Sequence, residues 1–362
     1  MFDQGARVER LLARHRDVSV VQTGALLRRD EVLVADSDVG RAADLLRRWT
    51  AGSEPGPGLT RLRLNRSARV DVCELSLLAR DRGLSVSPNH LVYGQPMWWT
   101  GPADRPLPVP PLPVPDAAAT GGGAHGVTVA ILDTGLDPHP WYAAADWFAE
   151  HAEADREVLD ADLDYELDAQ SGHGTFIAGV VLQRAPSARL VARRVIGGDG
   201  VGDELHVIRA LHGLKADVVN LSLGCHTFDD RPSPLLQRAV AALGRGTVVI
   251  ACAGNTASDR PFWPAALKQA VAVAALDGAE RAWFSNHGWW VDAAAPGTAV
   301  HSTFVRFGEF EGYAAWSGTS FAAPAVAGEV AARVARGMAP ADAADAVLGS
   351  GPVRPGLGTL VA

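Results

Sequence analysis

From residue 126 onward, short apolar runs alternate with helix-like segments, and this alternation limits the folds that the chain can adopt. The first run, residues 126–132 (G-V-T-V-A-I-L), is rich in the branched residues of strands that are buried in parallel sheets. Repeated strand–helix–strand units predict an α/β fold, a parallel sheet with helices on both faces. We expect further strands at 189–196, 216–223, 247–253 and 270–275, and helices that begin at 173 and cover 204–214 and 235–243.

Polar residues follow several of these expected strands. Asp133 comes directly after the first strand, Gly224 and Asn255 follow two later ones, and His173 opens a helix. Because sites in open α/β sheets lie at the carboxyl ends of the strands, we expect these residues to meet at one edge. Each also has an ordinary structural explanation: a turn for Asp-Thr-Gly, a helix cap for the histidine and a loop for the asparagine.

A run of small residues, W-S-G-T-S-F-A-A-P-A-V-A-G at 316–328, opens an apolar, Ala-rich segment that predicts a buried helix. We expect Ser320 at the N-terminus of this helix and Pro324 in its first turn, where a missing N–H costs little. Unpaired backbone N–H groups and the helix dipole would stabilise an oxyanion formed beside Ser320. A serine that only caps the helix is the alternative.

Together these residues can carry out nucleophilic catalysis. Serine is a weak nucleophile and needs a base within hydrogen-bond reach, a task that suits histidine near neutral pH. The histidine in turn needs a carboxylate that holds its tautomer and stabilises the imidazolium. Asp133, His173 and Ser320 supply these groups in the order Asp, His, Ser, and the Asn255 amide is a candidate donor to the oxyanion.

Residues 126 to about 338 resemble the subtilisin family of serine peptidases (subtilases). V-A-I-L-D-T-G resembles the family's aspartate motif, S-G-H-G-T-F-I-A-G its histidine motif, S-G-T-S-F-A-A-P-A-V-A-G its serine motif, and A-G-N at 253–255 its oxyanion motif. The resemblance implies a subtilisin-like catalytic domain over 124–350, followed by a tail at 351–362. It assigns the triad to Asp133, His173 and Ser320 and the oxyanion hole to Asn255. It also implies two strands that bind the substrate backbone, formed by Ser222, Leu223 and Gly224 and by Gly200, Val201 and Gly202.

The activity implied by this resemblance is that of a serine endopeptidase that cleaves peptide or protein substrates through an acyl-enzyme on Ser320. A self-inhibited or peptide-binding pseudo-protease is the alternative from another class, and the intact set of four motifs argues against a dead site. A dedicated leader-peptide processing protease would differ by its narrow specificity, which the sequence does not give.

Residues 1–100 predict a small α+β domain of the ferredoxin-like kind, with the element order β-α-β-α-β. Its end, S-V-S-P-N-H-L-V-Y at 85–93, resembles the end of a subtilase propeptide, a domain that assists folding and inhibits the enzyme. We hypothesise that the tail near Tyr93 enters the cleft as an added strand, which would make this domain an intramolecular inhibitor. An unrelated interaction domain is the alternative. We expect strands at 18–22, 26–35, 60–64 and 84–93, helices at 39–49 and 70–82, and a Gly/Pro-rich loop at 51–59.

The two expected domains are joined by a Pro- and Gly-rich linker at 101–123. Proline at this density favours polyproline II and predicts a semi-rigid tether. A ligand for proline-reading domains is the alternative interpretation.

The charge of the chain limits its partners. Lys+Arg 33 against Asp+Glu 41 gives a net charge of −8, which argues against nucleic acid or an anionic membrane as a partner. No segment reaches the roughly 18 apolar residues that span a bilayer, and the N-terminus lacks the apolar core of a signal peptide. Three cysteines, Cys73, Cys225 and Cys252, suit a reducing compartment. We therefore expect a cytoplasmic protein, with export by another route as the alternative.

No metal or cofactor is expected. Histidine, cysteine and acidic residues do not cluster in the sequence with metal-ligand spacing, and Gly200 and Gly202 lack a full phosphate-loop pattern. Only V-V-L-Q-R separates the histidine motif from the next turn, where family members with a tight calcium site carry an extra loop. The acidic stretch 155–168 predicts a solvated loop, with weak cation binding as the alternative. A disulfide between Cys225 and Cys252 is an alternative to two free thiols, because their strands should be neighbours.

Overall fold

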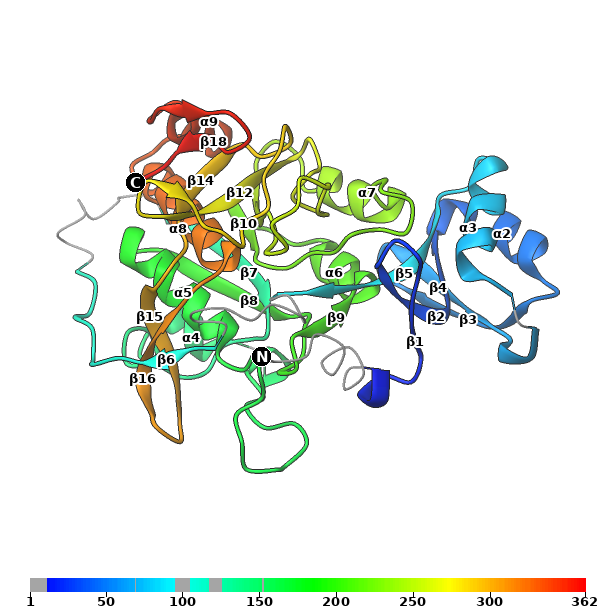
Figure 1. The fold of residues 1–362 in the computed structure, drawn as a ribbon, viewed down its shortest axis with the longest axis horizontal. Coiled ribbons are helices and arrows are strands. Elements are labelled where there is room, and N and C mark those ends of the chain that lie inside the picture. The colour runs from blue at the N-terminus through cyan, green and yellow to red at the C-terminus, as the bar shows by residue number, and fades with distance from the viewer. Residues whose placement is uncertain (1–11, 69, 95–104, 117–125, 152) are drawn as a thin grey trace.

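A nine-stranded sheet lies at the centre of the computed structural model, which describes residues 12–68, 70–94, 105–116, 126–151 and 153–362 (Figure 1). Its strand order is β17-β18-β14-β12-β11-β10-β7-β8, with β13 paired to β12 off this path. All neighbours pair in parallel except β12 with β13 and β17 with β18. The strands are β7 (Thr128–Asp133), β8 (Arg189–Arg194), β10 (Val218–Leu221), β11 (Val248–Cys252), β12 (Ala270–Asp277), β13 (Glu280–Arg281), β14 (Ala293–Pro296), β17 (Val353–Arg354) and β18 (Gly358–Leu360).

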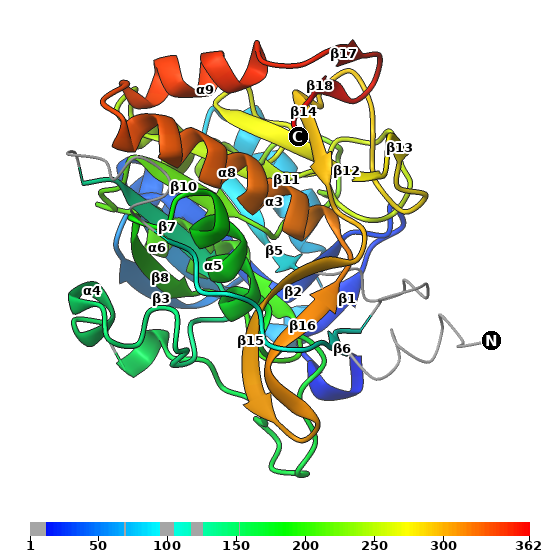
Figure 2. The ribbon, with the colours of Figure 1, turned by 90° about the vertical axis from the view of Figure 1, so that its left-hand side faces the viewer.

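Helices cover both faces of this sheet, which confirms the predicted α/β architecture. Figures 1 and 2 show α5, α8 and α9 on one side of the sheet and α6 on the other. The long helix α8 packs on α5 and on five strands of the sheet, so its Ala- and Val-rich sequence is buried on nearly every side. The helices are α4 (Asp146–Ala149), α5 (His173–Arg184), α6 (Glu204–Leu211), α7 (Pro234–Ala242), α8 (Thr319–Ala335) and α9 (Pro340–Leu348), with a 3₁₀ turn η3 (Glu153–Asp155).

The position of Pro324 in α8 differs from the prediction. The helix begins at Thr319, so Pro324 is its sixth residue and lies beyond the first turn. A proline there leaves the carbonyl four residues earlier, that of Ser320, without its helical partner. The Ser222 hydroxyl donates to this carbonyl instead, at 2.7 Å. A side chain from the strand next to α8 thus compensates for the proline.

The N-terminal region forms a separate antiparallel sheet in the order β3-β4-β2-β5, with β1 paired to β2. The predicted loop at 51–59 is wrong, because residues 50–56 form strand β3. As an edge strand with alternating exposure, β3 needs no apolar face and tolerates Pro55. The elements are β1 (Val18–Val20), β2 (Leu26–Ala35), η1 (Asp36–Asp38), α2 (Val39–Leu46), β3 (Thr50–Gly56), β4 (Leu59–Leu64), η2 (Arg66–Ala68), α3 (Val72–Asp81) and β5 (Val86–Tyr93).

This N-terminal sheet is covered on both faces. One face packs its apolar residues, among them Val34 and Leu62, against α2 and α3. The other face lies on α6 and α7 of the large domain, which contact β2, β4 and β5. Strand β5 then runs on from this sheet toward the large domain (Figure 1) and pairs antiparallel with β9 (Val201–Asp203). The two domains therefore share a continuous hydrogen-bonded sheet.

The linker and the C-terminal segment are both tied to the large domain. Within the described part of the linker, 105–116, the short strand β6 (Leu107–Pro108) pairs with β16 (Phe310–Trp316), which forms a hairpin with β15 (Val300–Phe307). Residues 351–362, expected to be a tail, instead supply β17 and β18 to the central sheet. Leu357 and Val361 are buried there, which fixes the segment to the core. None of the helices among the described residues has the length and apolarity to cross a membrane.

Candidate active site

The aspartate and the histidine of the predicted triad are in direct contact. Asp133 is the last residue of β7, and His173 is the first residue of α5. Its ring atom Nδ1 lies 2.7 Å from Asp133 Oδ1, and both side chains are buried. The same carboxylate oxygen accepts the backbone N–H of Thr134 at 2.8 Å. This geometry holds the imidazole with Nδ1 toward the carboxylate and leaves Nε2 for the catalytic proton.

Ser320 lies at the N-terminal end of α8, and its hydroxyl is engaged by another part of the chain. Its Oγ donates to the carbonyl of Gly94 at 2.7 Å, with the Ser222 carbonyl at 3.2 Å. His173 also borders Gly94, since a Cβ added to this glycine would lie 3.1 Å from His173 Cε1. Within the described residues His173 Nε2 has no hydrogen-bond partner. Ser320 and His173 thus both lie against Gly94. We call residues 91–94, which end the N-terminal domain, the N-terminal tail.

Asn255 is fixed beside the nucleophile. Its side-chain oxygen accepts both the backbone N–H and the hydroxyl of Thr319, each at 2.8 Å. Thr319 directly precedes Ser320, and its hydroxyl also accepts the N–H of Gly254 at 3.1 Å. Because the amide oxygen accepts from Thr319, the NH₂ group is the end of this side chain that can donate to an oxyanion.

The two predicted substrate strands flank the N-terminal tail. On one side, Tyr93 and Gly224 exchange backbone hydrogen bonds of 3.0 and 3.1 Å. On the other side, residues 91–93 pair with β9, with Val92 opposite Gly202 and Tyr93 opposite Val201. The tail is therefore the central strand of three, and the hypothesis of an added strand agrees with this geometry.

Two predicted substrate-binding residues do not contact the tail through this pairing. Leu223 is fully buried, and Gly200 lies in the turn that precedes β9, with φ at +80°. A Cβ on Gly200 would come within 2.4 Å of Gln170 Cγ, so this turn requires glycine. The third residue of the predicted strand 222–224, Ser222, uses its hydroxyl to donate to the Ser320 carbonyl.

Comparison with known proteins agrees with this geometry. The model of the subtilase family matches residues 124–347, more than half of the chain. The chain belongs to the subtilase family. It is 35% identical over 234 residues to the "Thermophilic serine proteinase" of Bacillus sp. (strain AK1), covering 59% of this chain and 54% of that protein. It is 36% identical over 231 residues to subtilisin BL of Lederbergia lenta, covering 60% of this chain and 79% of that protein.

A solved structure of a protease from Pseudoalteromonas arctica PAMC 21717 resembles this subtilase with a TM-score of 0.53 and 26% identity. The likeness covers 65% of this chain and 87% of that one. The chain spans about half the length of the first of the sequence relatives named above. The residues matched by the family model, 124–347, all lie in the large domain.

The cysteines of this subtilase are free thiols, and no disulfide joins Cys225 to Cys252. Both are buried in the apolar core, and burial raises the pKa of the Cys252 thiol to about 12. A thiol with a raised pKa is a poor nucleophile, so these cysteines serve as small buried residues.

The sequence analysis missed residues that act around the triad. Gly94, Thr319 and Glu157 lie beside the triad residues or their direct neighbours. No role was predicted for any of them, although Thr319 lies within the serine motif. In the acidic stretch 155–168, the carboxylate oxygens of Asp160, Asp162 and Asp164 lie within 4.8 Å of one another. Two of these three aspartates are exposed, as expected for a solvated loop.

Proposed function

We propose that this subtilase is a serine endopeptidase whose own N-terminal domain occupies the cleft as an inhibitor. One observation carries the proposal: a chain segment lies between the two substrate strands with its Gly94 carbonyl 2.7 Å from Ser320 Oγ. A peptide in this position presents a carbonyl to the nucleophile, as a substrate must.

In the proposed mechanism, Ser320 Oγ attacks the carbonyl carbon of a bound peptide and forms a tetrahedral intermediate. His173 Nε2 takes the serine proton and returns it to the leaving amine, while Asp133 holds the imidazole through Nδ1. The Asn255 amide and the Ser320 backbone N–H stabilise the oxyanion at the N-terminus of α8. Water then hydrolyses the acyl-enzyme with His173 as the base.

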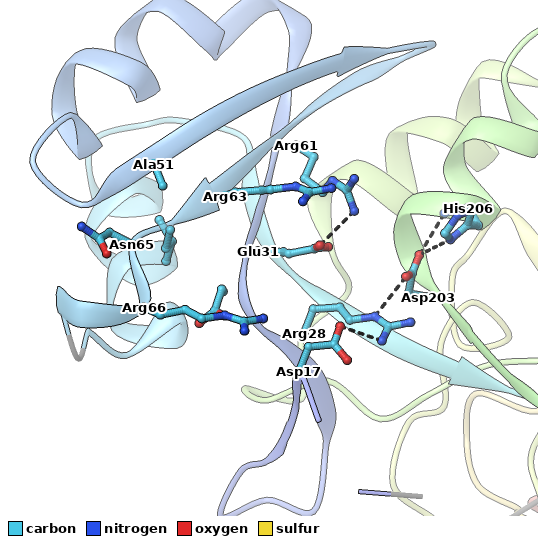
Figure 3. A pocket seen from close by; sticks show the side chains of 12 residues that line it. Asp17, Arg28, Glu31, Ala51, Arg61, Arg63, Asn65, Arg66, Asp203 and His206 are labelled. Carbon is cyan, nitrogen blue, oxygen red and sulfur yellow. Dashed lines mark hydrogen bonds and ion pairs between the residues drawn. The ribbon is translucent and has the colours of Figure 1, made fainter. Parts of the chain in front are cut away.

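Polar contacts between the domains support the inhibitory function of the N-terminal domain. Across the interface, Arg28 of β2 contacts Asp203 of β9 at 3.2 Å (Figure 3). Each partner also has a contact within its own domain: Arg28 lies 2.9 Å from Asp17, and Asp203 lies 2.6 Å from His206. The hydrogen bond to Asp203 raises the pKa of His206. These residues line a cavity of about 730 Å³ between the two domains. Deeper in the interface, buried His90 and Glu204 lie 2.9 Å apart.

A serine-directed fluorophosphonate probe tests the proposed activity. The wild-type chain is expected to form a covalent adduct on Ser320, because an activated serine attacks the phosphorus centre. Labelling is measured by intact mass and by peptide mapping, with Ser320→Ala as the control that removes the nucleophile. A wild-type chain that stays unlabelled in both its intact and its cleaved form would contradict the endopeptidase proposal.

Removal of the side-chain oxyanion donor is expected to slow catalysis strongly. Asn255→Ala should lower kcat about 10²–10³-fold with little change in KM, since loss of one such donor in the related enzyme subtilisin costs about 2.7–4 kcal/mol. Asn255→Asp is the matched control, because it keeps the acceptor for Thr319 but lacks the NH₂ donor. Steady-state kinetics on a quenched peptide should give similar losses for both variants. An Asn255→Asp enzyme with wild-type kcat would exclude this residue as the donor.

A further inference from the structure

Three chain segments meet behind the Asp133–His173 pair: the residues after β7, the residues after η3 and the N-terminus of α5. They touch backbone to backbone, since a Cβ on Gly135 would lie 2.6 Å from the Asp155 carbonyl and a Cβ on Gly174 2.1 Å from the Gly135 carbonyl. Leu136 and Arg156 form a parallel bridge between two of the segments. This close approach explains both glycines, and the Glu157 side chain then joins all three segments.

The Glu157 carboxylate accepts hydrogen bonds from both sides of the triad. From the aspartate side it accepts the hydroxyl of Thr134, the residue that follows Asp133. From the histidine side it accepts the N–H of Gly172 at 2.9 Å and the hydroxyl of Thr175 at 2.7 Å. The Thr134 hydroxyl in turn accepts the N–H of Gly174 at 2.9 Å. Hydrogen bonds to Glu157 or Thr134 thus hold the residues on both sides of His173.

We propose that Glu157 is a positioning residue of this active site, which holds the backbone around His173 in register with the backbone after Asp133. The inference rests on the proposed peptidase function for its effect on rate. It does not depend on that function for its effect on the Asp133–His173 hydrogen bond. Glu157 touches neither substrate nor reacting atoms, so its influence passes through the placement of the imidazole.

The electrostatic surroundings of Glu157 make its charge relevant as well. Burial of the carboxyl group raises the pKa of Glu157 to about 7, although the three hydrogen-bond donors lower it. Asp133 at the end of β7 and Tyr142 in the loop that follows interact with it electrostatically. Tyr142 in turn interacts with Asp137 and with Arg156, which precedes Glu157 in the chain. Above pH 7 the ionised Glu157 adds negative charge close to Asp133.

Two variants separate position from charge. Glu157→Ala removes every acceptor and is expected to lower kcat/KM about 100-fold, because small misplacements of catalytic groups carry losses of that order. Glu157→Gln keeps one acceptor oxygen and should stay within about 10-fold of wild type. Glu157→Gln should also change the pH–rate profile near pH 7, because it removes a carboxyl group close to Asp133 that ionises there. Glu166→Ala, an exposed residue of the same loop, is the matched control and should leave rate and pH profile unchanged.

A second readout needs no activity. In full-length Ser320→Ala protein, the low-field NMR resonance of the proton between His173 Nδ1 and Asp133 reports their hydrogen bond. We expect this resonance to broaden or vanish in Glu157→Ala and to persist with a shifted titration in Glu157→Gln. An unchanged resonance in folded Glu157→Ala, together with a rate within twofold of wild type, would overturn the proposal. If Glu157→Ala fails to fold, an unshifted resonance and pH profile in Glu157→Gln would overturn it instead. Absence of activity in the wild type would remove the proposed function but leave the resonance test intact.

Discussion

Ser320→Ala is expected to abolish peptide hydrolysis and to leave the chain at its full length. Without its Oγ the site has no nucleophile, and loss of the nucleophile in subtilisin lowers kcat by about 10⁶-fold. The Gly94 carbonyl lies against this hydroxyl, so self-cleavage of the wild type should cut within a residue or two of Gly94. Intact mass spectrometry of the purified proteins should therefore give a full-length variant and a shortened wild type.

The control for this experiment is Ser187→Ala, which removes an exposed serine from the turn before β8. This variant should be processed and should hydrolyse peptides like the wild type. Equal intact masses for wild type and Ser320→Ala would contradict self-cleavage but not inhibition. Residual hydrolysis by Ser320→Ala above a contaminant level would contradict the assignment of the nucleophile.

Gly94→Leu is expected to open the cleft of the full-length chain. A Cβ at this position would already lie 3.1 Å from His173 Cε1 and 3.2 Å from Ile196 Cδ1, closer than ordinary contact. A whole leucine side chain therefore cannot fit while the tail stays in place. Overpacking of this kind costs about 1–3 kcal/mol, which corresponds to roughly 5- to 150-fold in the population of molecules whose cleft is open. The rate of fluorophosphonate labelling of Ser320 should rise by a similar factor.

Gly40→Leu is the matched control for the tail variant. Gly40 lies near the start of α2 on the same domain, and a Cβ there meets nothing within 4 Å. The same side chain at this position should leave labelling at the wild-type rate, and thermal melting should show both variants folded. Equal labelling of wild type, Gly94→Leu and Gly40→Leu would show that the tail does not limit access to Ser320.

The chemistry of the site was predictable because short motifs encode it. Asp133 ends β7 and His173 begins α5, as the local patterns indicated, and the parallel alternation implied that strand ends meet at one edge. The prediction of Asn255 rested on the same logic, since it follows β11, a neighbour of β10 in the sheet. The positions of such motif residues depend on the local backbone at strand and helix ends, which the neighbouring residues in the sequence determine.

Other features depended on partners that are distant in the sequence. Strand β3 has no apolar pattern of its own and exists because β4 offers it backbone hydrogen bonds. Pro324 is tolerated inside α8 because Ser222, about a hundred residues earlier, satisfies the freed carbonyl. Glu157 lies in an acidic stretch that predicts a solvated loop, and only the packing of three segments turns its carboxylate inward.

The sequence by itself determined the α/β class, the order of the catalytic groups and the approximate strand and helix positions, since these depend on hydrophobic periodicity and short motifs. The motif at 85–93 suggested that the segment near Tyr93 enters the cleft, but only the tertiary structure decided that the Ser320 hydroxyl bonds to the Gly94 carbonyl. It also decided that the last residues complete the sheet. These outcomes depend on which surfaces bury each other and on backbone hydrogen bonds, whose donors and acceptors are the same in nearly every residue. These outcomes therefore cannot be predicted from the order of the side chains in the sequence.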